Sequence, residues 1–528
     1  MDPITHPISH GNEGIVNLRR ETAAIRAMRL PPKGFPIVFG NSVPTLDEGD
    51  TLRLIRCYTV PGFSGWGRPL LGTVNYFGGF ENLPLVLSQL GYNVIVVRIG
   101  PISSNKERAC EIFAQLTAGG FDPPGTRTTF VPVNFGINHP AEDLGLVAGA
   151  ETPRAVLYQA SGNALPVDWK WSDTNKVNFI CHSQGGTTVR CLIELLSGAS
   201  DRNLTAFLGV DRQPWVNSVV TIGTPHKGTT VTDVVNDLIS PDGLDPLVDL
   251  ITSCSFEDRQ DRVYDLHLDH WGFTNPSKQT YQAMRARIAP AVTTWWVGRY
   301  NGFYDNSVRG INALDSFAPD PSTHTYYFTM SFRATTPFPN DTLTAQEIND
   351  FIALFPYSWN PFGVGGIVLA PLQFLGPSAR AALGWMIAVA NNHLRPLGYF
   401  SRIPPPGNQI PRPDVLPLLS YPAYAMGGRN IPPGVAMPGI TSEEFQPNDG
   451  IVNTVSMDGP MTGPVNHGSF AAQLAARGPA NATAIYWHLG TNSTIDHADQ
   501  IGAFTNRITS DEVQVMYMLF AELVDHLG

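Results

Sequence analysis

The sequence predicts an α/β fold with a mostly parallel central sheet that is covered by helices on both faces. Short runs rich in β-branched and aromatic residues are strand candidates at 93–98, 177–181, 218–223, 325–331 and 484–489. Segments with apolar residues at helical spacing lie at 189–196 and 513–527. Short apolar strands that alternate with amphipathic helices are typical of a parallel sheet buried on both sides.

The 528 residues are expected to form one large domain with additions. Residues 1–50 are Pro-rich and polar and are interpreted as an N-terminal extension to a domain spanning 51–528. Two stretches that interrupt the strand and helix pattern, at about 118–175 and 333–447, are interpreted as insertions. The second contains an uncharged segment, 351–379, whose prolines argue against a membrane-spanning helix because they leave backbone groups unpaired.

Composition excludes several classes of protein. Charged residues make up 15% of the chain, well below the roughly 25% of an average domain, which argues against a disordered chain or a charged-helix scaffold. The net charge of −11 argues against a nucleic-acid partner, which rewards basic surfaces. The 5 cysteines form no CxxC pair, so a zinc ribbon or dithiol redox motif is not expected.

The sharpest motif is CHSQGG at 181–186, which follows a strand candidate and precedes a helix candidate. A strand–turn–helix of this kind is the setting of a nucleophile elbow, whose usual pattern is G-x-S-x-G. Here Cys181 replaces the first glycine, and its small side chain still suits a tight turn. The pattern predicts Ser183 as a nucleophile near the positive end of the helix. The alternative is a serine that merely caps the helix.

A serine nucleophile needs a base and an acid, and on this kind of fold the acid comes before the histidine in the chain. Asp449 lies in an Asn-Asp-Gly turn, and His497 follows the last strand candidate. The turn could equally carry an ordinary aspartate, and His497 could be a surface histidine. His467 and His488 are rival candidates for the base.

Several long blocks occur in one order along the chain: PGFSGWG at 61–67, GPISSN at 100–105, RACE at 108–111, HSQGG at 182–186, TPHKGTT at 224–230, YDLHLDHWG at 264–272, NDGIVNTVSM at 448–457 and DH at 496–497. With these blocks the chain resembles the bacillary and staphylococcal true lipases, which are α/β-hydrolases that act on triacylglycerols. The resemblance implies a carboxylic ester hydrolase with a triad of Ser183, Asp449 and His497. It also implies an oxyanion hole formed by the backbone N–H groups of Phe63 and Gln184.

The resemblance also implies a lid at about 229–262, where apolar residues recur at helical spacing. The expected substrate is an acylglycerol or another ester met at a lipid–water interface, without an integral membrane span. Two alternatives stay open. One is a short-chain carboxylesterase or acyltransferase with the same triad, and the other is a catalytically silent lipid-binding protein of the same fold. The family is secreted, but no conventional signal peptide is visible, so the localisation is not predicted.

The resembled family holds a structural zinc with two aspartates and two histidines. Here Asp269 and His139 match two of the ligands, Glu107 stands in place of a third, and the fourth position is a glycine. For the family's calcium site, Asp499 matches one carboxylate and Phe504 replaces another. We therefore expect that no cofactor is required and that neither zinc nor calcium is bound.

Overall fold

The computed structural model describes residues 12–30, 37–40, 76–79, 81–135, 149–160, 164–199, 206–238, 244–262, 264–337, 408–412, 414–435, 437–503, 505 and 507–527. Several features of the sequence fall outside these ranges. They include the oxyanion candidate Phe63, the metal-site positions His139 and Phe504, residues 239–243 of the predicted lid and the uncharged segment 351–379.

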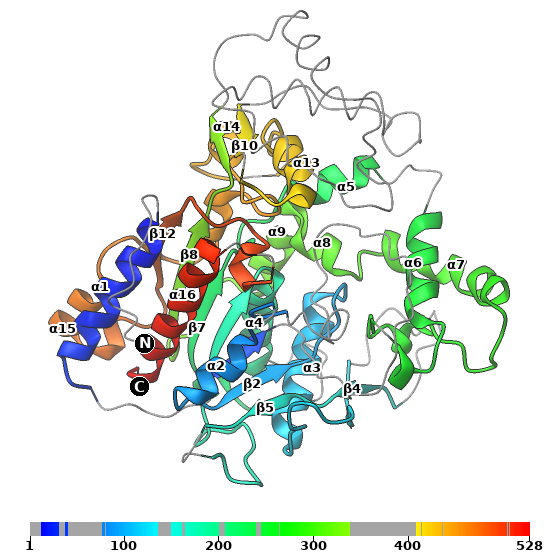
Figure 1. Ribbon diagram of the computed structural model, residues 1–528, viewed down its shortest axis with the longest axis horizontal. Coiled ribbons are helices and arrows are strands. Elements are labelled where there is room, and N and C mark those ends of the chain that lie inside the picture. The colour runs from blue at the N-terminus through cyan, green and yellow to red at the C-terminus, as the bar shows by residue number, and fades with distance from the viewer. Residues whose placement is uncertain are drawn as a thin grey trace, which may run out of the picture.

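The central sheet contains eight described strands in the order β11-β12-β8-β7-β6-β1-β2-β5 (Figure 1). Seven of them pair in parallel, and β5 joins the edge antiparallel to β2. The strands are β1 (Ile37–Gly40), β2 (Val94–Val97), β5 (Val156–Tyr158), β6 (Val177–His182), β7 (Val216–Ile222), β8 (Tyr326–Phe332), β11 (Val465–Asn466) and β12 (Tyr486–Asn492). The predicted parallel α/β sheet is thus confirmed, and β2, β6, β7, β8 and β12 overlap the five strand candidates.

Two layers of helices bury the two faces of this sheet. One layer is α1 (Glu13–Ala27), α2 (Leu83–Gln89) and α16 (Arg507–Asp525), and the other includes α3 (Asn105–Ala118), α4 (Gln184–Leu196) and α9 (Val308–Phe317). Alternate residues of each strand pack against different helical layers, because successive side chains of a strand point to opposite faces. In β2, Val94 and Val96 join the core under α1 and α16, whereas Ile95 and Val97 join the core under α3 and α4.

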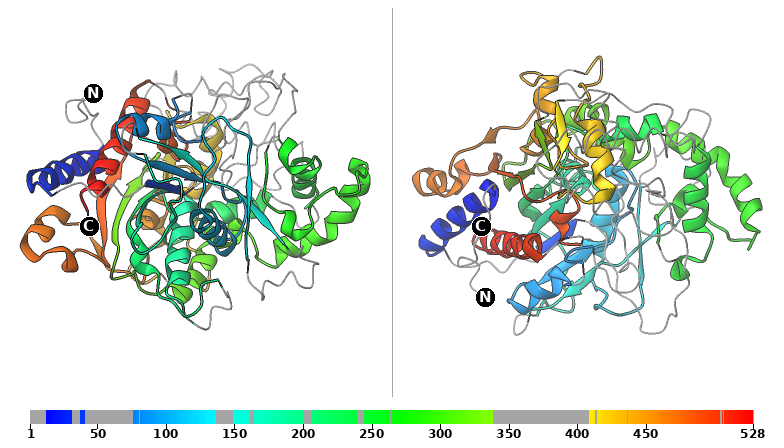
Figure 2. Two further views of the ribbon diagram at one scale, coloured as in Figure 1. Left: turned by 90° about the horizontal axis from the view of Figure 1, so that it is seen from below. Right: turned by 45° about the horizontal axis from the view of Figure 1, so that its top comes forward.

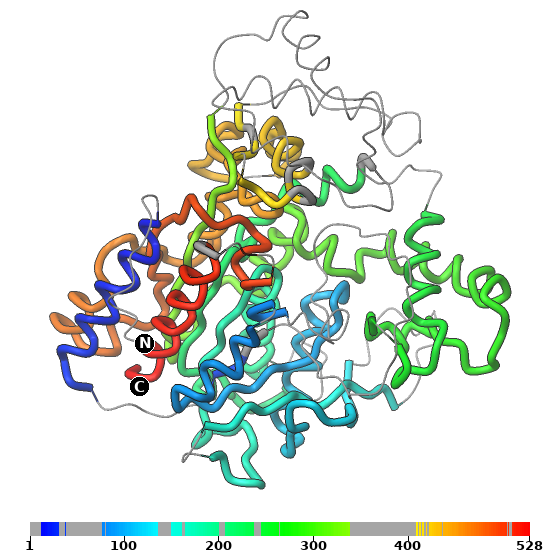
Figure 3. Tube along the Cα trace, viewed as in Figure 1, coloured from blue at the N-terminus to red at the C-terminus, as the bar shows by residue number. Residues whose placement is uncertain are grey.

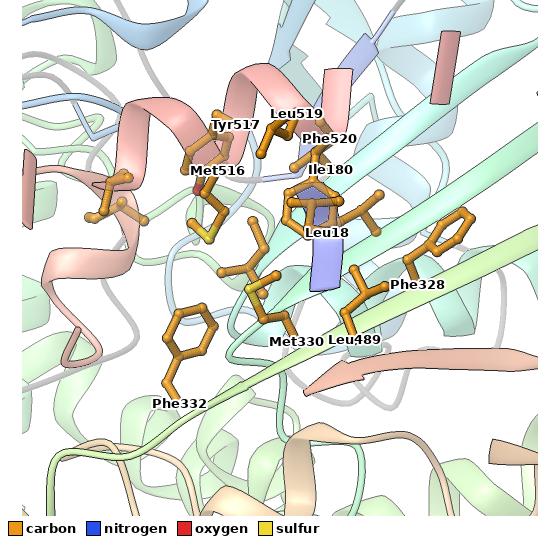
Figure 4. Packing of buried hydrophobic residues seen from close by; sticks show 14 of the residues in the cluster. Leu18, Ile180, Phe328, Met330, Phe332, Leu489, Met516, Tyr517, Leu519 and Phe520 are labelled. Atoms are coloured by element: carbon orange, nitrogen blue, oxygen red, sulfur yellow. The ribbon is translucent and has the colours of Figure 1, made fainter. Parts of the chain in front are cut away.

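Figure 4 shows the first of these cores, where Met516 and Phe520 of α16 and Leu18 of α1 meet Ile180 and Met330 of the sheet. The participation of α1 differs from the expectation of an N-terminal extension at 1–50. Ile15, Leu18 and Ile25 of α1 are fully buried, and α1 packs against both β12 and α16. This part of the N-terminal region therefore belongs to the same domain as the central sheet. Its apolar residues are interspersed with charged ones, so the helical period was not recognised in the sequence.

Residues predicted as an insertion at 118–175 contribute more than a loop. They contain the pair β3 (Phe130–Pro132) and β4 (Glu151–Pro153) and the edge strand β5 of the central sheet. These strands are only three residues long, too short for a recognisable period. The predicted insertion at 333–447 begins at β9 (Thr335–Pro337), which pairs with β10 (Gln409–Pro411).

Further α-helices lie around the sheet on more than one side (Figure 1). They are α5 (Val231–Leu238), α6 (Asp245–Ser255), α7 (Tyr281–Val297), α8 (Gly302–Asn306), α13 (Pro417–Met426), α14 (Ser442–Phe445) and α15 (Phe470–Arg477). Helices α6 and α7 pack on each other around a core of their own and lie beside the main body, as the views of Figure 2 and the trace of Figure 3 show. None of the helices in the described ranges is long and apolar enough to cross a membrane.

Candidate active site

Ser183 lies at the sharp turn between β6 and α4, with φ 55° and ψ −131°. A non-glycine residue rarely adopts a positive φ, so the turn must be held by its surroundings. The Ser183 N–H donates to Ile222 O at 2.9 Å, and Thr224 Oγ1 donates to Ser183 O at 2.9 Å. Both partners lie at or just after the end of β7, so the neighbouring strand fixes the strained backbone of the predicted elbow.

The small residues of the motif allow this close approach. A Cβ atom on Gly186 would lie 2.6 Å from Thr224 Cγ2 and 2.9 Å from Thr221 Cγ2, so any side chain there would force these threonines to shift. Cys181, which replaces the usual glycine, is fully buried in the core under α4, and burial raises the pKa of its thiol. Its thiol is therefore a small core group rather than a reactive one.

Asp449 lies in the predicted Asn-Asp-Gly turn and is fully buried. Its Oδ1 accepts the backbone N–H groups of Ile451 at 3.0 Å and Val452 at 2.7 Å, a local pattern typical of an aspartate that caps a turn. Its backbone O accepts the N–H of His497 at 3.0 Å. The turn thus holds Oδ1 and leaves Oδ2 free to face the loop that carries His497.

The structure brings Ser183, His497 and Asp449 together. His497 Nδ1 is 2.7 Å from Asp449 Oδ2, and His497 Nε2 is 3.1 Å from Ser183 Oγ. The rival histidines occupy another place, since His488 Nδ1 bonds to Thr329 Oγ1 at 3.1 Å and its ring lies edge-on to His467. The geometry therefore favours His497 as the partner of Ser183.

Gln184, the second predicted oxyanion donor, is the first residue of α4 and is buried. At this position a backbone N–H has no acceptor within the helix. Its side chain points to α3 and the residues just before it. Nε2 donates to Ser103 O at 3.2 Å, and Oε1 accepts from the buried Arg108 of α3 at 3.3 Å. Phe63, the other predicted donor, lies outside the described residues.

A chain of buried polar side chains behind Ser183, His497 and Asp449 was not predicted. Tyr76 bonds to His182, His182 to Gln500, and Gln500 to Asp449. His182 precedes the nucleophile in the motif and Gln500 follows His497 by three residues, yet neither position has a chemical signature of its own in the sequence. Burial and the neighbouring His497 hold the pKa of His182 well below its usual value, so this ring is neutral.

The described residues at the resembled zinc site do not fit a metal. Glu107 accepts from Trp271 Nε1 at 2.7 Å and from His270, and Asp269 Oδ1 accepts from Arg262 at 2.7 Å. Both carboxylates are thus bonded to protein donors, one of them a cation. Across the part of the chain that the structure describes, no cluster of three or more His, Cys, Asp or Glu residues could hold a metal ion.

The predicted lid region at 229–262 divides into two parts. At the start of α5, Thr229 Oγ1 donates to Ile451 O, and Thr230 N–H donates to Asn453 Oδ1 at 2.9 Å, so this end is fastened to the turn of Asp449. Helix α6 instead packs on α7 through Val248 and other apolar side chains. A lid role for the region stays a prediction.

Comparison with known proteins supports the resemblance. Residues 158–355 match the family model of a lipase-like C-terminal domain. Lipase 1 of Staphylococcus aureus is 27% identical over 287 residues, which cover 51% of this chain and 37% of that protein. The lipase of Staphylococcus hyicus is also 27% identical, over 290 residues that cover 52% and 40% of the two chains. The chain thus spans well under half the length of the curated relatives it matches.

Comparison with solved structures confirms the α/β-hydrolase fold. EstA from Clostridium botulinum aligns with a TM-score of 0.55 at 19% identity and covers 97% of this chain and 98% of its own. Lipase 1 from Pelosinus fermentans aligns with a TM-score of 0.54 at 22% identity, covering 93% and 98%. The crystal structure of Staphylococcus hyicus lipase gives a TM-score of 0.54 at 18% identity, covering 94% and 96%.

Proposed function

We propose that this chain, an α/β-hydrolase that resembles the staphylococcal lipases, hydrolyses carboxylic esters with Ser183 as its nucleophile. One observation carries the proposal. Ser183 Oγ, the His497 ring and the Asp449 carboxylate form a continuous hydrogen-bonded line with distances of 3.1 Å and 2.7 Å. A nucleophile, a base within hydrogen-bond reach and a third group that orients the base are the parts that acyl transfer requires.

In the proposed reaction, Ser183 Oγ attacks the ester carbonyl while His497 Nε2 takes the hydroxyl proton. The tetrahedral intermediate then collapses, and His497 returns that proton to the leaving alcohol as the acyl–oxygen bond breaks. Water repeats the sequence on the acyl-enzyme, gives its proton to His497 and releases the carboxylic acid with Ser183 restored. Asp449 keeps Nδ1 protonated and stabilises the imidazolium formed in each step.

The negative oxygen of the intermediate needs donors in place before the reaction. The backbone N–H of Gln184 suits this role because it belongs to the first residue after the nucleophile, at the positive end of α4. We also propose Phe63 N–H as the second donor, as the resemblance implies. Losing one such donor typically reduces kcat by about 10²–10³-fold.

The proposed substrates are acylglycerols presented at a lipid–water interface. This finer proposal is supported by the similarity to the lipases of Staphylococcus aureus and Staphylococcus hyicus, and by the apolar helical spacing at 229–262. The alternatives are a short-chain carboxylesterase, an acyltransferase and a silent lipid-binding protein.

The first experiment measures hydrolysis of a soluble short-chain p-nitrophenyl ester by the wild-type chain and by Ser183→Ala. Turnover by the wild type and its loss in Ser183→Ala are expected, with unchanged circular dichroism as the control for folding. Equal turnover by the two proteins would overturn the assignment of Ser183, and no turnover by either would favour the silent lipid-binding protein.

The second experiment compares an emulsified long-chain triacylglycerol with the soluble short ester. A lipase is expected to hydrolyse the emulsion, whereas an esterase turns over only the soluble substrate. Adding an acceptor alcohol in water and analysing the products distinguishes an acyltransferase, which would form the new ester in preference to the free acid.

A further inference from the structure

The Gln500 side chain bridges the acid of the proposed triad and a second histidine. Gln500 Nε2 donates to Asp449 Oδ2 at 2.7 Å, and Gln500 Oε1 lies 3.1 Å from His182 Nε2. Asp449 Oδ2 is the same oxygen that bonds to His497 Nδ1. The amide therefore shares one carboxylate oxygen with the proposed catalytic base.

The orientation of this amide follows from the chemistry of its neighbours. The carboxylate of Asp449 can only accept, so Gln500 must present its NH2 group to it and its oxygen to His182. His182 Nε2 must then carry a hydrogen, which leaves Nδ1 as the acceptor of the Tyr76 hydroxyl at 2.8 Å. A neutral ring with one donor and one acceptor satisfies both neighbours. Each group in the chain thus has one consistent role.

The site is shaped to hold this side chain. Gln500 is fully buried, and its backbone N–H donates to Asp496 O at 3.2 Å in the turn that also carries His497. Gly223, at the end of β7, has φ 61°, and a Cβ atom there would lie 2.9 Å from Gln500 Cδ and closer still to Oε1. The absence of a side chain on Gly223 makes room for the amide oxygen.

We propose that Gln500 is a positioning residue, which fixes the Asp449 carboxylate toward His497 and withdraws part of its negative charge. The inference rests on the proposed ester hydrolysis by Ser183 and deepens it. With Gln500 in place, Oδ2 receives two donors and Oδ1 receives two backbone donors, so the carboxylate cannot rotate without losing hydrogen bonds. Hydrogen bonds to a charged group are among the stronger ones in a protein.

A second consequence concerns pH. A hydrogen bond donated to a carboxylate spreads its charge, so it weakens the attraction between Asp449 and the imidazolium of His497. Without Gln500 the imidazolium is more stable, and His497 becomes an effective base only at higher pH. Besides Asp449, the titratable groups nearby are His182 on β6, Tyr76 behind it, and the neighbouring carboxyls of Asp496 and Asp499 in the turn of His497 itself.

The test is Gln500→Met, which keeps the length of the side chain and removes the amide. On a soluble short ester, kcat/KM at its optimum is expected to fall at least about 10-fold. The Asp449 carboxylate is then no longer held toward His497, and this loss of orientation outweighs the stronger attraction for the imidazolium. The fall should appear in kcat rather than KM, because Gln500 does not reach the substrate. The acid limb of the pH profile is expected to move to higher pH, which loss of folded protein alone would not produce.

Gln115→Met is the matched control. Gln115 is also buried and also makes hydrogen bonds through its amide, to Arg98 and Thr152, but it lies outside the proposed site. The control should lower the melting temperature and leave the acid limb in place. In the double variant Asp449→Asn with Gln500→Met, the second change should have little further effect on kcat. The Asp449 carboxylate, to which the Gln500 amide donates, is already absent from this variant.

Gln500→Glu is the second variant, and its shape makes it the most conservative. Its new carboxyl faces Asp449, so it can donate only while protonated and repels Asp449 once ionised. The expected result is a kcat/KM that declines as the pH rises above neutrality, where wild type is level.

An unmoved acid limb in Gln500→Met together with a level profile in Gln500→Glu would refute the role of Gln500. If Ser183→Ala still abolished hydrolysis, the proposed function would survive that result. Conversely, full activity in Ser183→Ala would overturn the proposed function whatever the Gln500 variants showed.

Discussion

The substitution Asp449→Asn tests the proposed triad most directly, because the structure dictates how the new amide must lie. Asp449 Oδ1 accepts the N–H groups of Ile451 and Val452, so the carbonyl oxygen of asparagine keeps that position. The NH2 group then takes the place of Oδ2 and faces His497 Nδ1, which lies 2.7 Å from that oxygen in wild type. Two donors cannot share a hydrogen bond.

His497 resolves this conflict by moving its hydrogen from Nδ1 to Nε2. The Nε2 atom, 3.1 Å from Ser183 Oγ, then carries a hydrogen and cannot accept the serine proton. A wrong tautomer of this kind reduces kcat by about 10⁴-fold in a serine triad, which corresponds to about 5 kcal/mol of transition-state stabilisation. The same loss is expected here near neutral pH.

Stability should change much less than activity. The Gln500 amide can turn over to accept from the new NH2 group, and His182 can shift its hydrogen so that Tyr76 becomes the acceptor. We therefore expect the free energy of unfolding to fall by no more than about 1–2 kcal/mol. Urea unfolding measures this, and kcat on a soluble ester measures the catalytic loss.

Asp122→Asn provides the matched control, since Asp122 is a buried carboxylate that bonds to Arg98 and Thr129 away from the site. It should lower stability while kcat stays within a few-fold of wild type. If Asp449→Asn kept kcat within about 10-fold of wild type, the tautomer argument and the assignment of Asp449 would both be refuted.

Three further outcomes are expected. His497→Ala should lose nearly all ester hydrolysis and His488→Ala should retain most of it, and the reverse pattern in kcat would make the base assignment wrong. Gly186→Ala should lower the free energy of unfolding in urea by about 1–3 kcal/mol through crowding against Thr224, and adding Thr224→Ala should recover part of that loss rather than deepen it. Burial raises the pKa of Asp305 to about 7, so the folded state holds a proton that the unfolded chain releases near pH 4. The free energy of unfolding should therefore decline as the pH rises from about 4 to 7. An equally steep decline in Asp305→Asn would contradict this.

Much of the fold could be predicted because its signals are local. The β-branched and aromatic runs that became β2, β6, β7 and β8 are buried on both faces, so each reads as a short, mainly apolar segment. The run that became β12 is buried over only part of its length. The turn that carries Ser183 could also be predicted, because the strand, Ser183 and the glycine pair lie within ten residues of each other. Chain order then suggested the acid and the base, although Asp449 and His497 lie far from Ser183 along the chain.

Other elements carried no such signal. The three residues of β5 are too few to show a period, and the apolar residues of α1 are interspersed with charged ones, so neither was expected in the sheet or its core. Both are positioned by segments distant in the sequence: β5 pairs with β2, and α1 packs against β12 and α16.

The sequence by itself determined the α/β architecture, the turn that exposes Ser183 and the candidates for its acid and base. Only the tertiary structure decided which histidine reaches Ser183 and which side chains support Asp449. Residues 76, 182, 449 and 500 meet because the end of β6, the turn of Asp449 and the loop after β12 converge at the carboxyl edge of the sheet. Hydrogen bonds between such distant segments depend on strand register and helix packing, and a local pattern of residues does not encode these.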